Sequence, residues 1–164
     1  MIYDNSKVRR QDRLLEEKRA IELLQNSEYG VLSVTGSDGL PYAIPLNFVW
    51  NKESAVYVHC AETGKKIDAL KKNPYVSFCI VGRVNLLPDK FTTEYESVIM
   101  QGKAELDIRD EEKTAAIELL LNKLSSDYIT IGRKYAAKSF HRTRIIRIDF
   151  TQWSGKCKRV MTGH

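Results

Sequence analysis

The residues from 42 to 81 constrain the fold most, because β-rich runs alternate there with one short charged helix. The segments follow one another as two β-rich runs, a helix and a further β-rich run: Tyr42–Trp50, Ala55–Cys60, Lys65–Lys72 and Tyr75–Val81. The first two runs flank a polar turn, which is a hairpin signal. Strands that follow one another through hairpins favour an antiparallel sheet over parallel βαβ winding.

The start of the short helix breaks a local rule. With Thr63 as its N-cap, Lys65 and Lys66 occupy the first turn, where free backbone N–H groups and the helix dipole already make the site positive. Two cations there cost stability unless an anion binds, and such a broken rule points to function. A strand end, small residues, a helix N-terminus and paired lysines together describe a phosphate-binding site. A solvated lysine pair on a surface helix is the alternative that composition leaves open.

The remaining chain adds further strands and brings the helices to three. Periodicity predicts a helix over Arg13–Gln25, a helix that Asp110 caps and that ends at Leu124, and strands over Tyr29–Thr35, Tyr95–Ile108 and Arg144–Gln152. We expect an N-terminus up to about Asp12 that is loosely held or draped on a partner, a loop over Gly82–Thr93 and a mixed segment over Ser125–Lys138. Pro45 has no N–H to donate, so its strand should be at an edge or bulged. The pattern predicts a mainly β fold, either a barrel or a strongly curled sheet, with helices packed outside.

Composition excludes several classes of function. The chain has 164 residues, which suits one domain with a real core, and its net charge of +5 is spread along the sequence, which does not favour nucleic-acid binding. No apolar run approaches a membrane span and the N-terminus is not signal-like, so we expect a cytoplasmic protein without a membrane partner. Neither the cysteines nor the histidines have the spacing of a disulfide framework or a metal site: Cys60, Cys79, Cys157, His59, His141 and His164.

Four sequence pieces, weak singly but specific in their order and spacing, carry a resemblance to a known family. They are YAIPLN at Tyr42–Asn47, HCAETGKK at His59–Lys66 with Asp68–Leu70 and Asn73-Pro74 after it, SVIMQGKAE at Ser97–Glu105, and WSGK at Trp153–Lys156. The chain resembles the FMN-binding split barrels of the pyridoxamine 5′-phosphate oxidase-like superfamily, and within it the nitroimidazole-resistance (Nim) family. The resemblance covers residues from about 29 to 156. It implies a single split-barrel domain over 1–164, with an N-terminal helix at about 12–26 and the barrel at about 29–156.

The resemblance also implies a cofactor site. The strand Ile44–Val49 would follow the flavin through backbone groups, His59 and Cys60 would lie beside it, and the two lysines would hold the FMN phosphate. Ser97 would add a polar contact, while Trp153 and Lys156 would reach a flavin bound mainly by the other subunit of a homodimer. The cofactor-binding residues so implied are Ile44, Pro45, Leu46, Asn47, Phe48, Val49, His59, Cys60, Thr63, Lys65, Lys66, Ser97, Trp153 and Lys156.

Some residues keep an alternative role. His59 is the candidate catalytic residue, but it could be an ordinary strand histidine. Trp153 could be a core or interface packing residue. The apolar stripe of the 110–124 helix is expected to be core: Ile117, Leu120, Leu121 and Leu124. Oxidases of the superfamily that act on pyridoxamine phosphate carry an Arg-x-His pair in a longer C-terminal segment, and Lys156–Val160 has no equivalent, which favours the Nim-like branch over vitamin B6 oxidation.

The resulting hypothesis is an FMN-dependent oxidoreductase, with no metal. A nicotinamide would reduce the flavin, and a small electron-poor acceptor such as a nitro compound or a quinone would reoxidise it. One alternative is a flavin carrier or sensor without turnover. A further alternative keeps the split barrel and changes the ligand to haem or a deazaflavin.

Overall fold

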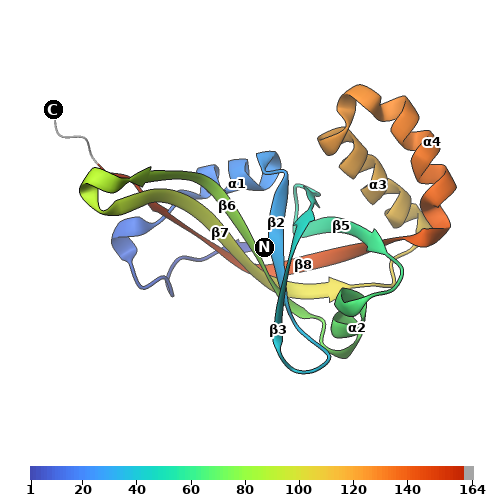
Figure 1. Ribbon diagram of the computed structural model, residues 1–164, viewed down its shortest axis with the longest axis horizontal. Coiled ribbons are helices and arrows are strands. Elements are labelled where there is room, and N and C mark those ends of the chain that lie inside the picture. The colour runs from blue at the N-terminus through green and yellow to red at the C-terminus, as the bar shows by residue number, and fades with distance from the viewer. Residues whose placement is uncertain (161–164) are drawn as a thin grey trace.

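The computed structural model describes residues 1–160 as mainly antiparallel β-sheet with helices around it, which confirms the predicted fold class at that level (Figure 1). The strands are β1 Ile2–Tyr3, β2 Tyr29–Thr35, β3 Pro41–Asn47, β4 Val49–Trp50, β5 Ala55–Ala61, β6 Tyr75–Leu87, β7 Thr92–Glu105 and β8 Thr143–Lys158. The α-helices are α1 Glu17–Asn26, α2 Lys65–Lys72, α3 Asp110–Leu124 and α4 Ile129–Ser139, and the 3₁₀ turns are η1 Gln11–Arg13, η2 Pro88–Lys90, η3 Ser126–Tyr128 and η4 Phe140–Arg142. His164 lies outside the described residues.

The sheet rolls up because its two edge strands are neighbours in sequence. Its hydrogen-bonded order is β3-β2-β6-β7-β8-β5-β4, with β1 added beside β8. Asn47 ends one edge strand and Val49 begins the other, so the single residue Phe48 joins opposite edges. Phe48 is fully buried and its ring meets that of Phe78 edge-on at 5.2 Å between centroids. Pro45 lies on the edge strand β3, as the sequence predicts.

The core fills the inside of this curl. Alternate residues of the central strands are buried and form one cluster: Leu32, Val34, Phe78, Ile80, Val98, Met100, Ile146, Ile148 and Phe150. Helix α1 adds Ala20, Leu23 and Leu24 to this cluster. A second, smaller cluster lies where α3 covers the other side of β5, and it contains Tyr57 and Leu120.

A glycine allows β7 and β8 to approach closely at a bulge. The register between the two strands shifts between Gln101 and Gly102. A Cβ on Gly102 would collide with the carbonyl oxygen of Asp149, so a larger residue there would force the strands apart.

The expectation of a loose N-terminus is wrong. Strand β1 pairs in parallel with β8, where Ile2 lies opposite Gln152 and Tyr3 opposite Trp153. The Tyr3 hydroxyl donates to the carbonyl oxygen of Leu15, and the side-chain oxygen of Asn5 accepts from the Gly155 N–H at 3.1 Å. The predicted first helix also begins later than expected, at Glu17.

Two further segments differ from their sequence predictions. The expected loop at 82–93 is mostly strand, because β6 and β7 continue as a two-stranded arm in which Val84 lies opposite Tyr95 and Leu87 opposite Thr92 (Figure 1). The register of the two strands shifts between Val81 and Val84, and η2 forms the tip of the arm. The weakly patterned segment 125–138 is largely the helix α4, which packs beside α3.

Candidate functional site

The start of α2 has backbone donors without partners. Gly64, not the expected Thr63, is the N-cap residue, and no side chain caps the helix. The first backbone bond runs from the Asp68 N–H to the Gly64 oxygen at 3.1 Å. Within residues 1–160, the N–H groups of Lys65, Lys66 and Ile67 form no hydrogen bond. Gly64 has a φ of 133°, which strains any residue with a side chain, so glycine is needed for this turn.

The two lysines at this helix start have different surroundings. Lys65 is held near the turn between β2 and β3, because its Nζ lies 4.0 Å from the Asp38 carboxylate and 4.7 Å from the Tyr42 ring centroid. Lys66 forms no ion pair within the described chain. Free N–H groups, the helix dipole and a lysine without an ion pair at one helix start are the features that favour binding of an anion.

The end of β5 lies beside this helix start. His59 and Cys60 lie opposite Ile145 and Arg144 of β8. Partial burial, followed by the charge of Lys66, lowers the pKa of His59, so the imidazole is mainly neutral at pH 7. Burial raises the pKa of the Cys60 thiol, which keeps the sulfur protonated and unreactive.

The strand predicted to follow the flavin presents only some of its side chains. Along β3, Pro45 and Asn47 are exposed, whereas Ile44 and Leu46 are half-buried toward the core. The Asn47 side-chain amide donates to the Glu28 oxygen at 3.0 Å. Phe48 and Val49 are buried, so a ligand beside them would meet backbone rather than side chain.

The remaining predicted site residues lie far from α2 in the same chain. Ser97 of β7 and Lys156 of β8 are direct cross-strand neighbours. Arg144, opposite Cys60, lies near one end of β8 and Lys156 near the other, which is a path of roughly 40 Å along the extended strand. Trp153 faces the interior, is 3% exposed, and packs edge-on against Tyr3 with 4.7 Å between centroids. The packing role considered for Trp153 is therefore the one that this chain displays.

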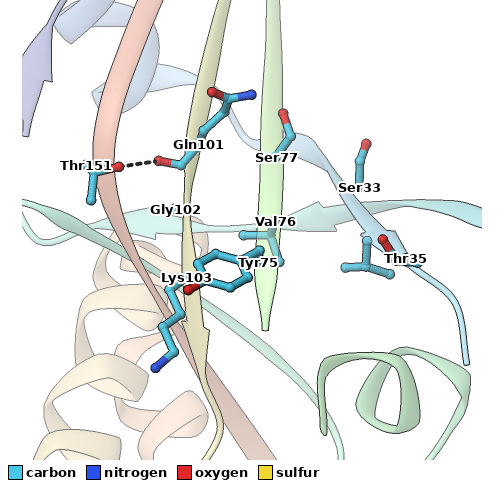
Figure 2. A pocket seen from close by; sticks show the side chains of 10 residues that line it. Ser33, Thr35, Tyr75, Val76, Ser77, Gln101, Gly102, Lys103 and Thr151 are labelled. Carbon is cyan, nitrogen blue, oxygen red and sulfur yellow. Dashed lines mark hydrogen bonds between the residues drawn. The ribbon is translucent and has the colours of Figure 1, made fainter. Parts of the chain in front are cut away.

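A polar groove on the outer face of the sheet escaped sequence reasoning. It crosses β2, β6, β7 and β8, has a volume of about 520 Å³, and is lined by hydroxyls and amides that include Ser33, Ser77 and Gln101 (Figure 2). Ser33 lies opposite Ser77, and Ser77 opposite Gln101, so the three side chains share one face. Alternating small polar residues in three strands would have predicted this row, but the register between strands was unknown.

A partly buried lysine is a second feature that the sequence does not reveal. Lys123 of α3 places its Nζ 3.9 Å from the ring centroid of Phe48 and 3.5 Å from the carbonyl oxygen of Leu24. Loss of water around the ammonium lowers its pKa to about 8. No carboxylate pairs with Lys123 within residues 1–160.

The fold and this site define a class: curled antiparallel barrels whose surface carries a basic, uncapped helix start. Residues 16–157 match the family model described as pyridoxamine 5′-phosphate oxidase, and the chain belongs to that family. The resemblance predicted from the four sequence pieces is thereby confirmed. No curated protein matches the sequence significantly.

Solved structures agree on the fold. A candidate 5-nitroimidazole antibiotic resistance protein from Bacteroides thetaiotaomicron has a TM-score of 0.70 at 20% identity, over 88% of this chain and 86% of that one. An FAD-binding protein from Mesorhizobium loti has a TM-score of 0.61 at 23% identity, over 90% of this chain and 98% of that one. An FAD- and haem-binding protein from Mycobacterium smegmatis has a TM-score of 0.70 at 18% identity, over 93% of this chain and 76% of that one. At such identities these likenesses show the fold alone.

Residues 1–160 contain neither a membrane-spanning helix nor a cluster of metal ligands. No helix there is long and apolar enough to cross a membrane. No group of three His, Cys, Asp or Glu side chains in that range is arranged to hold a metal ion.

Proposed function

We propose that this chain is a flavoprotein that holds the phosphate of FMN at the start of α2. The observation that carries the proposal is the combination of three unbonded N–H groups with Lys66, a cation that has no carboxylate partner in the described chain. These donors suit a phosphate dianion in charge and in hydrogen bonding. The family match, and the flavins named for two of the similar structures, support the same ligand class.

The proposed activity is that of an oxidoreductase. Bound FMN would supply hydride chemistry, with a nicotinamide as reductant and a small electron-poor molecule, such as a nitro compound or quinone, as acceptor. The chain would bind the phosphate through Lys65 and Lys66 and orient the ring along the backbone of β3. His59, neutral at pH 7, would offer one hydrogen-bond donor and one acceptor at the strand end.

A homodimer would complete the flavin site. In the same chain, Ser97 and Lys156 lie toward the opposite end of β8 from Arg144, the residue that pairs with Cys60, which is a path of roughly 40 Å along the strand. A second copy could bring its own Ser97–Lys156 pair to the flavin. The outer sheet face near this pair exposes apolar side chains suited to such a contact, namely Tyr29, Val81 and Ile99.

Absorption spectroscopy of the purified protein, followed by titration with FMN, FAD and riboflavin, tests the proposal. We expect two flavin bands, stoichiometric FMN and weak riboflavin binding. A Soret band would point instead to haem, and a colourless protein that FMN does not titrate would refute flavin binding. With FMN bound, the absence of oxidation of NADH or NADPH with any acceptor would leave a flavin carrier or sensor.

A further inference from the structure

A cavity of about 430 Å³ lies between α3 and α4 at the end of β5. Its walls are mainly aliphatic and aromatic, with side chains from both helices: Ile117, Leu120, Leu121, Leu124, Ile131 and Tyr135. The apolar stripe of α3, which the sequence predicts to be core, is only partly core. Leu120 is buried, whereas Ile117, Leu121 and Leu124 are half-buried around the cavity. A cavity of this size, with apolar walls and few polar groups, has the usual form of a small-molecule site.

Two of the hydroxyls that line this cavity, those of Ser139 and Thr143, are already hydrogen-bonded to backbone, and the other polar groups of the lining are neutral hydroxyls and the His59 ring. The Ser139 hydroxyl donates to the backbone carbonyl oxygen of Tyr135 at 3.0 Å, and the Thr143 hydroxyl donates to the backbone carbonyl oxygen of Ser139 at 2.9 Å. No Asp, Glu, Lys or Arg lines the described cavity. An ionised ligand would lose its water there without gaining a counter-charge, which is a large penalty. The lining therefore selects against charge.

Helix α4 and the end of the turn η3 before it also present apolar and aromatic surface at the cavity. Tyr128, Ile131 and Tyr135 are 68%, 67% and 66% exposed although all three line the cavity. Their spacing of three and four residues places them on one face. Tyrosine rings offer flat apolar faces with a polar tip, which suits stacking against another aromatic ring.

We propose that this cavity binds an uncharged aromatic molecule and that this molecule is the electron acceptor. The second part rests on the proposed flavoprotein function, in which a nicotinamide supplies the electrons by way of the flavin. His59 connects the two sites, because it lines the cavity and lies at the end of the strand that leads into α2. Pyridoxamine phosphate, a phosphate ester, does not suit this lining, which has no cation.

A matched pair of probes tests binding without any redox chemistry. Naphthalene-2-carboxamide and naphthalene-2-carboxylate have nearly the same shape but differ in charge. In calorimetric titrations of the flavin-free protein, we expect the carboxamide to bind at least about tenfold more tightly. In NMR spectra it should shift the ring signals of His59 but not those of His141. Equal or tighter binding of the carboxylate, or no binding of either probe, would overturn the proposal.

Variants place the probe in the cavity. Ala136 lines the cavity, so Ala136→Leu should weaken carboxamide binding by about tenfold, whereas Ala115→Leu, on an exposed position of α3 outside the lining, should not. Ile131→Lys places a cation at an exposed site and should reverse the preference toward the carboxylate, whether or not Ala136→Leu folds. If the carboxamide fails to bind and Ile131→Lys instead weakens self-association, a second copy of the chain covers this cavity. The proposal would then be wrong.

The acceptor role has a separate readout. In the FMN-loaded protein, the carboxamide should compete with 2-methyl-1,4-naphthoquinone in nicotinamide-dependent turnover. Carboxamide binding without competition would refute the acceptor role and leave the cavity as a binding site. Carboxamide binding by a protein that takes up no flavin would refute the proposed function, and with it the acceptor role, but not the cavity.

Discussion

Lys66 at the start of α2 and Lys123 near the end of α3 both lack a carboxylate partner in the described chain, but their surroundings differ. Lys66 faces an open helix start, where water or a phosphate can satisfy it. Lys123 lies over Phe48 with little water, and its pKa falls to about 8. In the proposed function a bound phosphate would relieve the unfavourable charge of the first lysine, whereas the unfavourable charge of the second is a permanent cost to folding.

The largest expected effect concerns Lys66. Lys66→Ala should weaken FMN binding by about 1.5–3 kcal/mol, the scale of a charged hydrogen bond, or ten- to a hundredfold in the dissociation constant. Riboflavin, which lacks the phosphate, should be nearly indifferent to the substitution. The melting temperature of the flavin-free protein should hold or rise, because removing a cation from a helix start relieves the dipole conflict. Lys71→Ala, at an exposed position near the other end of α2, is the control. If Lys66→Ala weakens the binding of FMN and of riboflavin equally, Lys66 does not contact the phosphate.

The next effect concerns stability. Lys123→Met keeps the length of the side chain and removes the charge, so at pH 7 it should raise the free energy of unfolding by on the order of 1 kcal/mol. Chemical denaturation measures this, with Lys134→Met on the exposed side of α4 as control. A destabilised Lys123→Met protein would mean that the contacts to Phe48 and the Leu24 carbonyl outweigh the lost hydration.

The pH dependence of stability isolates the same group. Because the folded pKa of Lys123 is about 8 and its ordinary value is 10.5, the unfolded chain holds more protons between these values. The free energy of unfolding of the parent protein should therefore rise as the pH increases from 8 toward 10.5. Below pH 8 the full cost of burying the charged Lys123 ammonium remains. The difference between the parent and Lys123→Met in denaturation midpoint should shrink across this range. A constant difference would show that Lys123 does not titrate as a buried group.

The smallest effect connects Lys66 to His59. NMR titration should give His59 a pKa below its ordinary value of 6.5, and Lys66→Ala should move it upward, because one nearby positive charge is lost. Burial is the larger cause, so the pKa should stay below 6.5 in the variant. His141, on the exposed surface, serves as the reference signal. If the pKa of His59 is the same in the parent and in Lys66→Ala, the histidine does not lie close to the Lys66 ammonium.

The sequence predicts elements where one local signal is strong. The bounds of β2 and α2 agree with their predictions residue for residue, because turn residues and helical periodicity mark their ends. Helix α3 ends at Leu124 as predicted, but its N-cap is Arg109, and Asp110, the expected cap, is its first residue. The arm of β6 and β7 was missed because Gly82 and Pro88 resemble loop signals, while the pairing that sustains it joins residues across two strands. Helix α4 was missed because Ile129, Thr130 and Ile131 are β-branched, and packing against α3 overrides that preference.

The candidate site divides in the same way. The lysine pair at α2 follows from sequence, since adjacent residues define a helix start. The absence of a Thr63 cap, the burial of Trp153 and the environment of Lys123 depend on contacts between residues far apart in the chain. No local pattern contains that information.

The place of β8 has a consequence for how the chain is made. This strand, the last of the described sheet to be synthesised, lies between β7 and β5 and also pairs with β1. On the ribosome, β5 and β7 must therefore wait with one edge each unpaired until residues 143–158 have emerged. Open strand edges recruit other chains, so the nascent protein is most prone to aggregation just before its final strand arrives.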